Sequence, residues 1–218
     1  MKIISDSRQI PKTVEYTRAE GYYDYLYAYL QEISFWDGET GHPRYLKKQQ
    51  VKFVAMRKEL HKSRQTISLH FKSLVEMGLV VETKDGYILT ILDSDLAMLV
   101  PVNTLRILTN TFVDRVITIY VHLLNRYIAN SYFNQPTVFT YEQLKRVAGL
   151  SVNSGNNDEK IRDILFILDK VGLLRYKMAT MIEGENIKTP YMVTWMTNNI
   201  EDAKDAYLEF CKGERKVI

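Results

Sequence analysis

Positively charged side chains are concentrated in one short part of this sequence. Residues 44 to 72 contain nine lysine and arginine residues and one acidic residue, Glu59, although the whole chain has a formal net charge of only +3. The nine are Arg44, Lys47, Lys48, Lys52, Arg57, Lys58, Lys62, Arg64 and Lys72. Such a local excess is typical of a surface that attracts a polyanion. The alternative is a solvated helix face whose charges serve only solubility.

The end of this basic segment has the pattern of a helix with one apolar and one polar side. Ile67, Phe71 and Leu74 recur at helical spacing, and Ser63 stands where an N-cap is expected. The opposite side carries Arg64, Gln65, Ser68 and Lys72. Arginine can donate two hydrogen bonds to guanine, and glutamine can pair in a similar way with adenine. We therefore predict that these four residues read base edges in the major groove of DNA.

A second set of residues surrounds the start of this helix, where side chains and backbone amides commonly contact phosphate oxygens. Its members are Lys58, His61, Lys62, Ser63 and Thr66. Lys47 and Lys48 would extend the positively charged surface along the flanking DNA backbone. Lys84, at the tip of a predicted hairpin, would either reach the minor groove or its phosphates, or serve only as a turn residue.

Two helices and a hairpin, within residues 51 to 92, must hold these side chains in place. Gly78 is expected to end the second helix in the left-handed conformation. The hairpin strands are predicted at residues 79 to 82 and 87 to 92, and Asp85-Gly86 between them would supply the positive φ angles of a tight turn. Helix, turn, helix and hairpin, in this order, predict a winged helix-turn-helix.

The middle of the chain is predicted to be helical. Residues 22 to 35 have an apolar stripe at helical spacing, and residues 93 to 100 are interpreted as a short connector helix. Residues 103 to 133 are predicted to form a long helical region that is apolar nearly all round its surface, and therefore buried, either centrally or between subunits. We expect a homodimer from the part of this region at residues 112 to 130, and a domain boundary near residue 100.

The last third of the chain repeats the pattern of the first. Two helices are expected between residues 141 and 172, followed by strands at 174 to 182 and 187 to 195 and a terminal helix at 201 to 213. The second of the two helices carries Asp158, Glu159, Asp163 and Asp169, which would repel phosphates. Protein contact or dimerisation is therefore the expected use of this second unit. The predicted fold class is mainly α with small β wings: two tandem winged helix-turn-helix domains, residues 1–100 and 101–218, joined by the long, largely buried helical region.

The stretch SRQTISLHFKSLVEMGLVVE resembles the recognition helix and wing of winged helix-turn-helix regulators. The segments VPVNTLRILTNTFVDRVITIYVHLLNRY, FTYEQLKRVAGL and DEKIRDILFILDKVGLLRY are similar to helix-turn-helix proteins of Gram-positive plasmids and phages, including replication-initiation proteins of the DnaD type. The resemblance implies a sequence-specific double-stranded DNA-binding protein, either a transcriptional regulator or an origin binder. The alternative is a non-catalytic replisome or partition adaptor that contacts replication or transcription proteins.

Motifs for other chemistry are missing from the sequence. There is no GxxxxGK[ST] phosphate loop, GxSxG elbow, HExxH or CxxC, and the four histidines have no metal-ligand spacing. We therefore expect no enzyme activity, no metal and no cofactor. The single cysteine, Cys211, rules out an internal disulfide, and no apolar stretch reaches the length of a membrane span. A cytoplasmic protein with no membrane partner is predicted.

Overall fold

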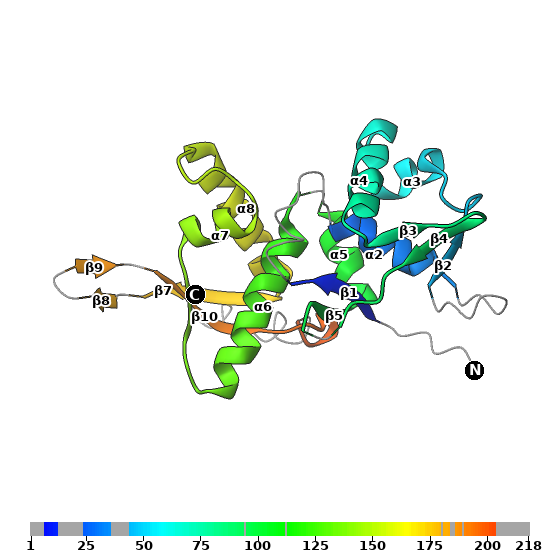
Figure 1. Cartoon of the computed structure of the whole chain (residues 1–218). Coiled ribbons are helices and arrows are strands. Elements are labelled where there is room, and N and C mark those ends of the chain that lie inside the picture. Colours follow the sequence, from blue (N-terminus) through cyan, green and yellow to red (C-terminus); the bar gives the residue numbers. More distant parts are fainter. Residues whose placement is uncertain are drawn as a thin grey trace, which may run out of the picture. The chain divides into compact units, whose positions relative to one another are not determined.

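The computed structural model of the chain forms two compact units, which divide between Ile117 and Thr118 (Figure 1). We describe each unit by itself. The structure describes residues 7–12, 24–35, 44–93, 95–111, 113–179, 181–183, 186–188 and 190–203. Cys211 and the predicted terminal helix beyond residue 203 lie outside these ranges.

The predicted class, a mainly α fold of two tandem winged helix-turn-helix domains with small β wings, is wrong. The described residues form a mixed α/β structure, in which about half are helical and about a fifth lie in strands. Those strands build antiparallel sheets of two and three strands. Each three-stranded sheet joins a local hairpin to a strand from before the two preceding helices. Such non-local pairing leaves no periodic signal in a short window of sequence, so the sequence predicts a smaller share of residues in strands than the structure contains.

Unit 1 contains two sheets and four described helices. In chain order its elements are β1 (Ser7–Pro11), α2 (Asp24–Ile33), β2 (Tyr45–Lys47), α3 (Phe53–Leu60), α4 (Arg64–Glu76), β3 (Val80–Glu82), β4 (Gly86–Leu89), β5 (Ala97–Pro101) and α5 (Val102–Asn110). Strands β3 and β4 form a hairpin, and β2 pairs antiparallel with the other edge of β4, which gives the order β2-β4-β3. The helices α3 and α4 lie next to this sheet (Figure 1).

The core of unit 1 forms where α2, α3 and α4 pack against this sheet. Leu26, Leu30, Ile67 and Leu74 are fully buried, and Leu46 of β2 joins them from the sheet. Their burial removes apolar side chains of three elements from water, and this is the main force that holds α4 in place. The predicted helix over residues 22 to 35 is confirmed as α2, within two residues at each end.

The strands β1 and β5 pair antiparallel, with Ser7 opposite Pro101 and Pro11 opposite Ala97. The prediction of a connector helix over residues 93 to 100 is therefore wrong, because pairing with a strand about ninety residues earlier overrides the local pattern. This pairing also ties α5 to unit 1. The boundary between the units consequently falls after Ile117, whereas the sequence suggested one near residue 100.

Unit 2 has the same order of elements as the middle of unit 1. It contains α6 (Val116–Tyr132), whose first two residues belong to unit 1, and then β6 (Thr137–Phe139), α7 (Tyr141–Val147), α8 (Gly155–Lys170), β7 (Leu174–Met178), β8 (Met181–Glu183), β9 (Asn186–Lys188) and β10 (Tyr191–Met196). The sheet order is β6-β10-β7, so the strand that precedes the two helices again pairs with the last strand. The helix α7 begins with a capping box between Thr140 and Gln143.

The long helical region predicted at residues 103 to 133 is two separate helices. α5 ends at Asn110, and α6 begins at Val116. The predicted burial of an apolar helix holds for the first half of α6, where Ile119, Tyr120 and Leu123 are fully buried. It does not hold for the end, because Ile128 and Tyr132 are exposed, as is Phe133 just beyond the helix.

Candidate nucleic-acid interface

The helix α4 presents a polar face to solvent. Its apolar side, with Ile67, Phe71 and Leu74, is buried. The four residues predicted to read bases, Arg64, Gln65, Ser68 and Lys72, are all exposed along the opposite face. Lys72 contacts Glu76 one turn later, with 3.5 Å between its Nζ and the carboxylate oxygen. Because both partners are exposed, this ion pair holds Lys72 only weakly.

Leu69, which was not predicted as a contact residue, is 64% exposed on the same face of α4. It lies between Gln65 and Lys72 in the helical repeat, so it shares their surface. An apolar side chain at this place can contact the methyl group of thymine in the major groove. The signal was present in the sequence, since Leu69 interrupts an otherwise polar stripe.

The turn between α3 and α4 has the geometry that the sequence predicted at the start of α4. Ser63 is the N-cap, and its side chain accepts a hydrogen bond from the Thr66 amide at 3.1 Å. The hydroxyl groups of Ser63 and Thr66 also form a hydrogen bond of 2.8 Å. His61 ends α3 in the left-handed conformation, with φ at 51°. The turn therefore contains only residues 61 to 63, and hydrogen bonds between Ser63 and Thr66 cap the start of α4.

Lys62 does not project freely from this turn. Its Nζ lies 2.7 Å from a carboxylate oxygen of Asp114 and 5.6 Å from the centre of the Tyr25 ring. Asp114 follows α5 in the chain, so the contact joins the segment after α5 to the start of α4. A phosphate that binds Lys62 must therefore compete with Asp114.

Other cations of the basic segment differ in their surroundings. Arg44 points inward and donates to Gln9 Oε1 at 2.9 Å, so its charge contributes less to the surface than the sequence suggested. Lys48 lies 3.6 Å from Glu82. Six exposed cations of unit 1 have no carboxylate partner among the residues that the structure describes; we call them the open cations. They are Lys47, Lys52, Arg57, Lys58, Arg64 and Lys84.

Lys52 and Arg57 belong to this set, although the sequence analysis named neither as a contact residue. Both are among the nine basic residues of the segment 44 to 72, and this local excess of positive charge is the only sequence feature that indicates them as contact residues. Lys52 is the N-cap of α3, and Arg57 lies in its last turn beside Lys58. The open cations thus extend from β2 along α3 to the start of α4, and Lys84 lies in the turn of the β3–β4 hairpin.

Gly86, the first residue of β4, has a different role from the predicted one. Its φ is not among the positive values in the described chain, so the turn does not depend on it for a left-handed conformation. Instead, a Cβ at this position would overlap the Leu46 carbonyl oxygen and lie 2.5 Å from the hydroxyl oxygen of Tyr45. The glycine is needed because β2 and the Tyr45 ring approach closely, whereas Gly78 has the predicted positive φ of 71°.

A buried histidine holds α4 against α2. His70 Nδ1 and the hydroxyl of Tyr25 form a hydrogen bond of 2.8 Å, and the two rings meet edge to face. Burial lowers the pKa of His70 to about 4, since nearby Asp114 only partly offsets it and Lys62 and Arg115 lower it further. The imidazole is therefore neutral at pH 7, because burial disfavours its charged form.

Acidification should destabilise unit 1 through His70. The unfolded chain binds a proton at His70 near pH 6.5, and the folded chain does so only near pH 4, so stability decreases as the pH falls through this window. Because solvent screens part of the effect, we expect a loss of about 1 to 2 kcal/mol. Chemical unfolding of the full chain at pH 7 and pH 4.5, compared with His70→Gln, measures the contribution. The variant should show a smaller difference between the two pH values.

The matched control is His61→Asn, because His61 is exposed and asparagine tolerates the left-handed conformation. This control should retain the full pH dependence. Burial also lowers the pKa of His122 in unit 2 to about 4, with Arg126 contributing, so part of the acid sensitivity will persist in every unit 1 variant. An unchanged pH dependence in His70→Gln would contradict the assignment.

In unit 2, the helix α8 corresponds in order to α4, but its charges are arranged differently. Asp158 lies 2.7 Å from the buried Nζ of Lys145, which also donates to the Val152 carbonyl at 2.7 Å. Asp169 pairs with Arg175 at 2.8 Å. Two of its four acids therefore serve ion pairs within unit 2, while Glu159 and Asp163 are exposed. Phe166 is also exposed on α8, and the Lys170 ammonium lies over its ring.

No helix in the described part of the chain is long and apolar enough to cross a lipid bilayer. Within the same ranges, His, Cys, Asp and Glu side chains form no cluster of three or more that could hold a metal ion. Comparison with protein-family models, curated proteins and solved structures finds no match for this chain.

Proposed function

We propose that unit 1 binds double-stranded DNA in a sequence-specific manner, with α4 in the major groove, and that the protein acts in the cytoplasm as a transcriptional regulator or a replication-origin binder. One observation carries the proposal. The exposed face of α4 holds Arg64, Gln65, Ser68 and Lys72, and the open cations lie on the elements around it. Hydrogen-bonding groups for bases and cations for phosphates thus occur on one small unit.

The roles divide according to position. Arg64 and Gln65, in the first turn of α4, donate to base edges, and Leu69 contacts a thymine methyl group. The open cations of α3 and Lys84 of the hairpin turn bind phosphates, which sets the register of α4 on the duplex. Ser63 already caps the helix, so its hydroxyl is a weaker candidate for phosphate than the backbone amides of the first turn.

Selection of bound sequences from random duplexes tests the proposal, followed by Arg64→Ala and Gln65→Ala. Each variant should lose about 1 to 3 kcal/mol of affinity for the selected site and almost none for random DNA, because only base contacts are removed. Fluorescence anisotropy with both duplexes measures the two affinities. Lys160→Ala, at an exposed position of α8, is the matched control and should bind like the unmodified chain.

Failure to enrich any sequence would reject specific recognition. A protein-interaction role has one observation in its favour, namely the exposed Phe166 on α8, where an apolar ring stands beside charged residues. We therefore propose protein contact, including an adaptor role in replication or partition, as the function of unit 2. The homodimer expected from residues 112 to 130 stays a prediction; Ile128 is an exposed apolar residue within this range, and Tyr132 lies just beyond it.

Asp114 should weaken DNA binding, because its carboxylate forms an ion pair with the Lys62 ammonium and so competes with phosphate for it. In Asp114→Asn the ion pair is lost, and Lys62 becomes available to one more phosphate. Affinity for random duplex should rise at low salt, and the dependence of log affinity on log salt should steepen by about 0.9. Lys62→Ala should have little effect in the original chain but should remove the whole gain in the Asp114→Asn background.

The control for this cycle is Asp169→Asn, which removes an ion-paired carboxylate from unit 2 instead. It changes the net charge by the same amount and should leave the slope unchanged. If both variants raise the affinity equally, the effect comes from net charge, and competition between Asp114 and phosphate is excluded.

A further inference from the structure

Strands β7 to β10 of unit 2 form one long hairpin. The pairs β7–β10 and β8–β9 share a single register, because Met178 lies opposite Tyr191 in the first pair and Met181 lies opposite Lys188 in the second. The β8–β9 part continues the hairpin beyond α7 and α8 in the view of Figure 1.

One edge of this hairpin is open. β7 is an outer strand of the sheet β6-β10-β7, and β8 pairs only with β9 among the described strands. The Ala179 amide donates to the Pro190 carbonyl at 2.8 Å, toward the other strand of the hairpin. Because backbone groups alternate between the two sides of a strand, the N–H and C=O groups of Met178 and Ile182 point to the open edge. Such an edge can pair with another strand.

The open edge lacks the features that normally keep edge strands apart. Between Lys177 and Glu183 the sequence contains no charged residue and no proline, which are the usual protection of an edge. Met178 is 65% exposed. A two-stranded hairpin is also only marginally stable by itself in water, and further strands stabilise it. This edge is therefore suited to pairing with a further strand.

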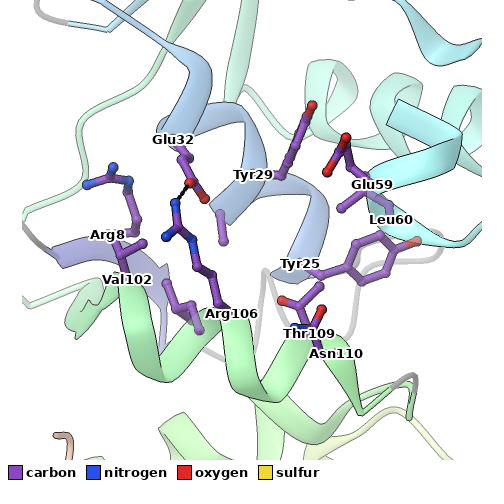
Figure 2. A pocket seen from close by; sticks show the side chains of 12 residues that line it. Arg8, Tyr25, Tyr29, Glu32, Glu59, Leu60, Val102, Arg106, Thr109 and Asn110 are labelled. Carbon is purple, nitrogen blue, oxygen red and sulfur yellow. Dashed lines mark hydrogen bonds and ion pairs between the residues drawn. The ribbon is translucent and has the colours of Figure 1, made fainter. Parts of the chain in front are cut away.

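The charges at the two ends of this uncharged run cannot neutralise each other within the chain. In unit 1, by contrast, Arg106 and Glu32 form an ion pair across the cavity between α2 and α5 (Figure 2). Lys177 and Glu183 lie six residues apart along one extended edge, which separates them by roughly 20 Å. Lys177 is exposed and forms no ion pair with a described residue.

We propose that this edge pairs with the same edge of a second copy of the chain, antiparallel and related by a two-fold axis. The register places Met178 opposite Ile182 of the partner subunit, so the outward backbone groups of the two edges form hydrogen bonds. It also places Lys177 opposite Glu183 of the partner subunit, and the symmetry repeats this ion pair. The two hairpins become one four-stranded antiparallel sheet.

The charges select this register. A shift by two residues toward β7 places Lys177 opposite Met181 of the partner subunit. It also places Glu183 opposite Arg175, which already pairs with Asp169 at 2.8 Å within its own chain. A shift in the other direction carries Lys177 beyond the end of β8. A shift by one residue brings outward backbone groups opposite inward ones and loses the hydrogen bonds.

The same charges favour a second copy over an extended segment of another protein. Any extended segment can satisfy the backbone groups of the edge. A second copy in addition supplies a complement for Lys177 and for Glu183, at the spacing that the edge requires. This pairing rests on the protein contact that we propose for unit 2, and it is independent of DNA binding by unit 1.

Sedimentation equilibrium of the full chain, over a range of concentrations, measures the association. Lys177→Glu and Glu183→Lys each place like charges opposite each other twice, and each should weaken self-association at least about tenfold. Across the hairpin these residues lie opposite Met192 and Asn186, so neither change places like charges opposite each other within the chain. Lys160→Glu, at an exposed position of α8, is the matched control and should have no effect.

An equimolar mixture of the two single variants gives the sharpest result. One Lys177→Glu chain and one Glu183→Lys chain have opposite charges at both pairs, so the mixture should associate as the original chain does, although neither variant does so alone. The double variant should also recover association. Misfolding of the single variants would not be reversed by mixing. Absence of recovery in the mixture would overturn the proposal.

A backbone variant tests the hydrogen bonds of the edge. Met178→Pro removes an N–H that points outward and keeps the hydrogen bonds between β7 and β10, so it should weaken the association at least about tenfold and leave the hairpin intact. Circular dichroism and thermal unfolding check that the variant folds. Unchanged association in a folded Met178→Pro chain would reject pairing at this edge.

Two further substitutions separate this edge from the exposed apolar residues of unit 2. Phe166→Ser and Ile128→Ser should leave the association unchanged. If either abolishes it while the charge reversals do not, the edge is rejected and protein contact by unit 2 is retained. A mass of one chain at every concentration would reject a second copy as the partner, but not contact of unit 2 with a different protein.

Discussion

The affinity of the full chain for random duplex DNA should fall by a factor on the order of 10³ when salt is raised from about 50 to about 200 mM. Each cation that neutralises a phosphate releases a counterion and contributes about 0.9 to the slope of log affinity against log salt. The five open cations other than Arg64, which we propose contacts a base, therefore predict a slope of about −4.5. Fluorescence anisotropy at several salt concentrations measures this slope.

Two triple variants show whether the slope depends on the open cations of unit 1 or only on the net charge of the chain. Lys52→Gln, Arg57→Gln and Lys58→Gln together remove three open cations from unit 1, and the slope should become shallower by roughly 3. Lys160→Gln, Lys170→Gln and Lys177→Gln remove three exposed cations from unit 2 and change the net charge equally. The slope should stay near its original value in this second variant. Equal flattening in both would mean that DNA contacts are spread over the whole surface.

The elements around α4 were the easiest part of the fold to predict. Ser63 as N-cap and Gly78 in the left-handed conformation are confirmed, because caps and glycine stops depend on chemistry within a few neighbouring residues. The exposed positions of Arg64 and Gln65 follow from helical periodicity once the buried side is known. Local rules were therefore sufficient for the two ends of α4 and for its exposed face.

Pairing between distant segments could not be predicted in this way. β1 and β5 each look unremarkable alone, and only their register with each other makes them strands. The same limit applies to charge. The sequence counts Arg44 and Lys62 as surface cations, but a glutamine from β1 accepts a hydrogen bond from the first, and an aspartate that follows α5 pairs with the second. The surface charge of unit 1 is thus set partly by residues remote from the basic segment.

Substitution of Gly86 should destabilise the protein more than substitution of Gly78 or Gly155. In Gly86→Ala the new methyl group meets the Leu46 carbonyl and the Tyr45 ring, and both belong to β2, which pairs with β4. Backbone cannot move aside as a flexible side chain can, so β2 must shift or separate from β4. We expect a loss of about 3 kcal/mol in the free energy of unfolding, the upper end of the usual cost of overpacking. Urea unfolding followed by circular dichroism measures it.

Two other glycines isolate the cause of this loss. Gly78→Ala adds a methyl group with no atom within 4 Å but forces alanine into a φ of +71°, so it should cost about 1 to 2 kcal/mol from backbone strain alone. Gly155→Ala has neither a close contact nor a positive φ, and alanine favours the first turn of α8, so stability should stay equal or rise slightly. A loss in Gly86→Ala no larger than that in Gly78→Ala would show that β2 yields easily to the new methyl group. Lys84 lies in the turn just before β4. A large loss of stability in Gly86→Ala would therefore also show that the close contact between Gly86 and β2 helps to position this lysine.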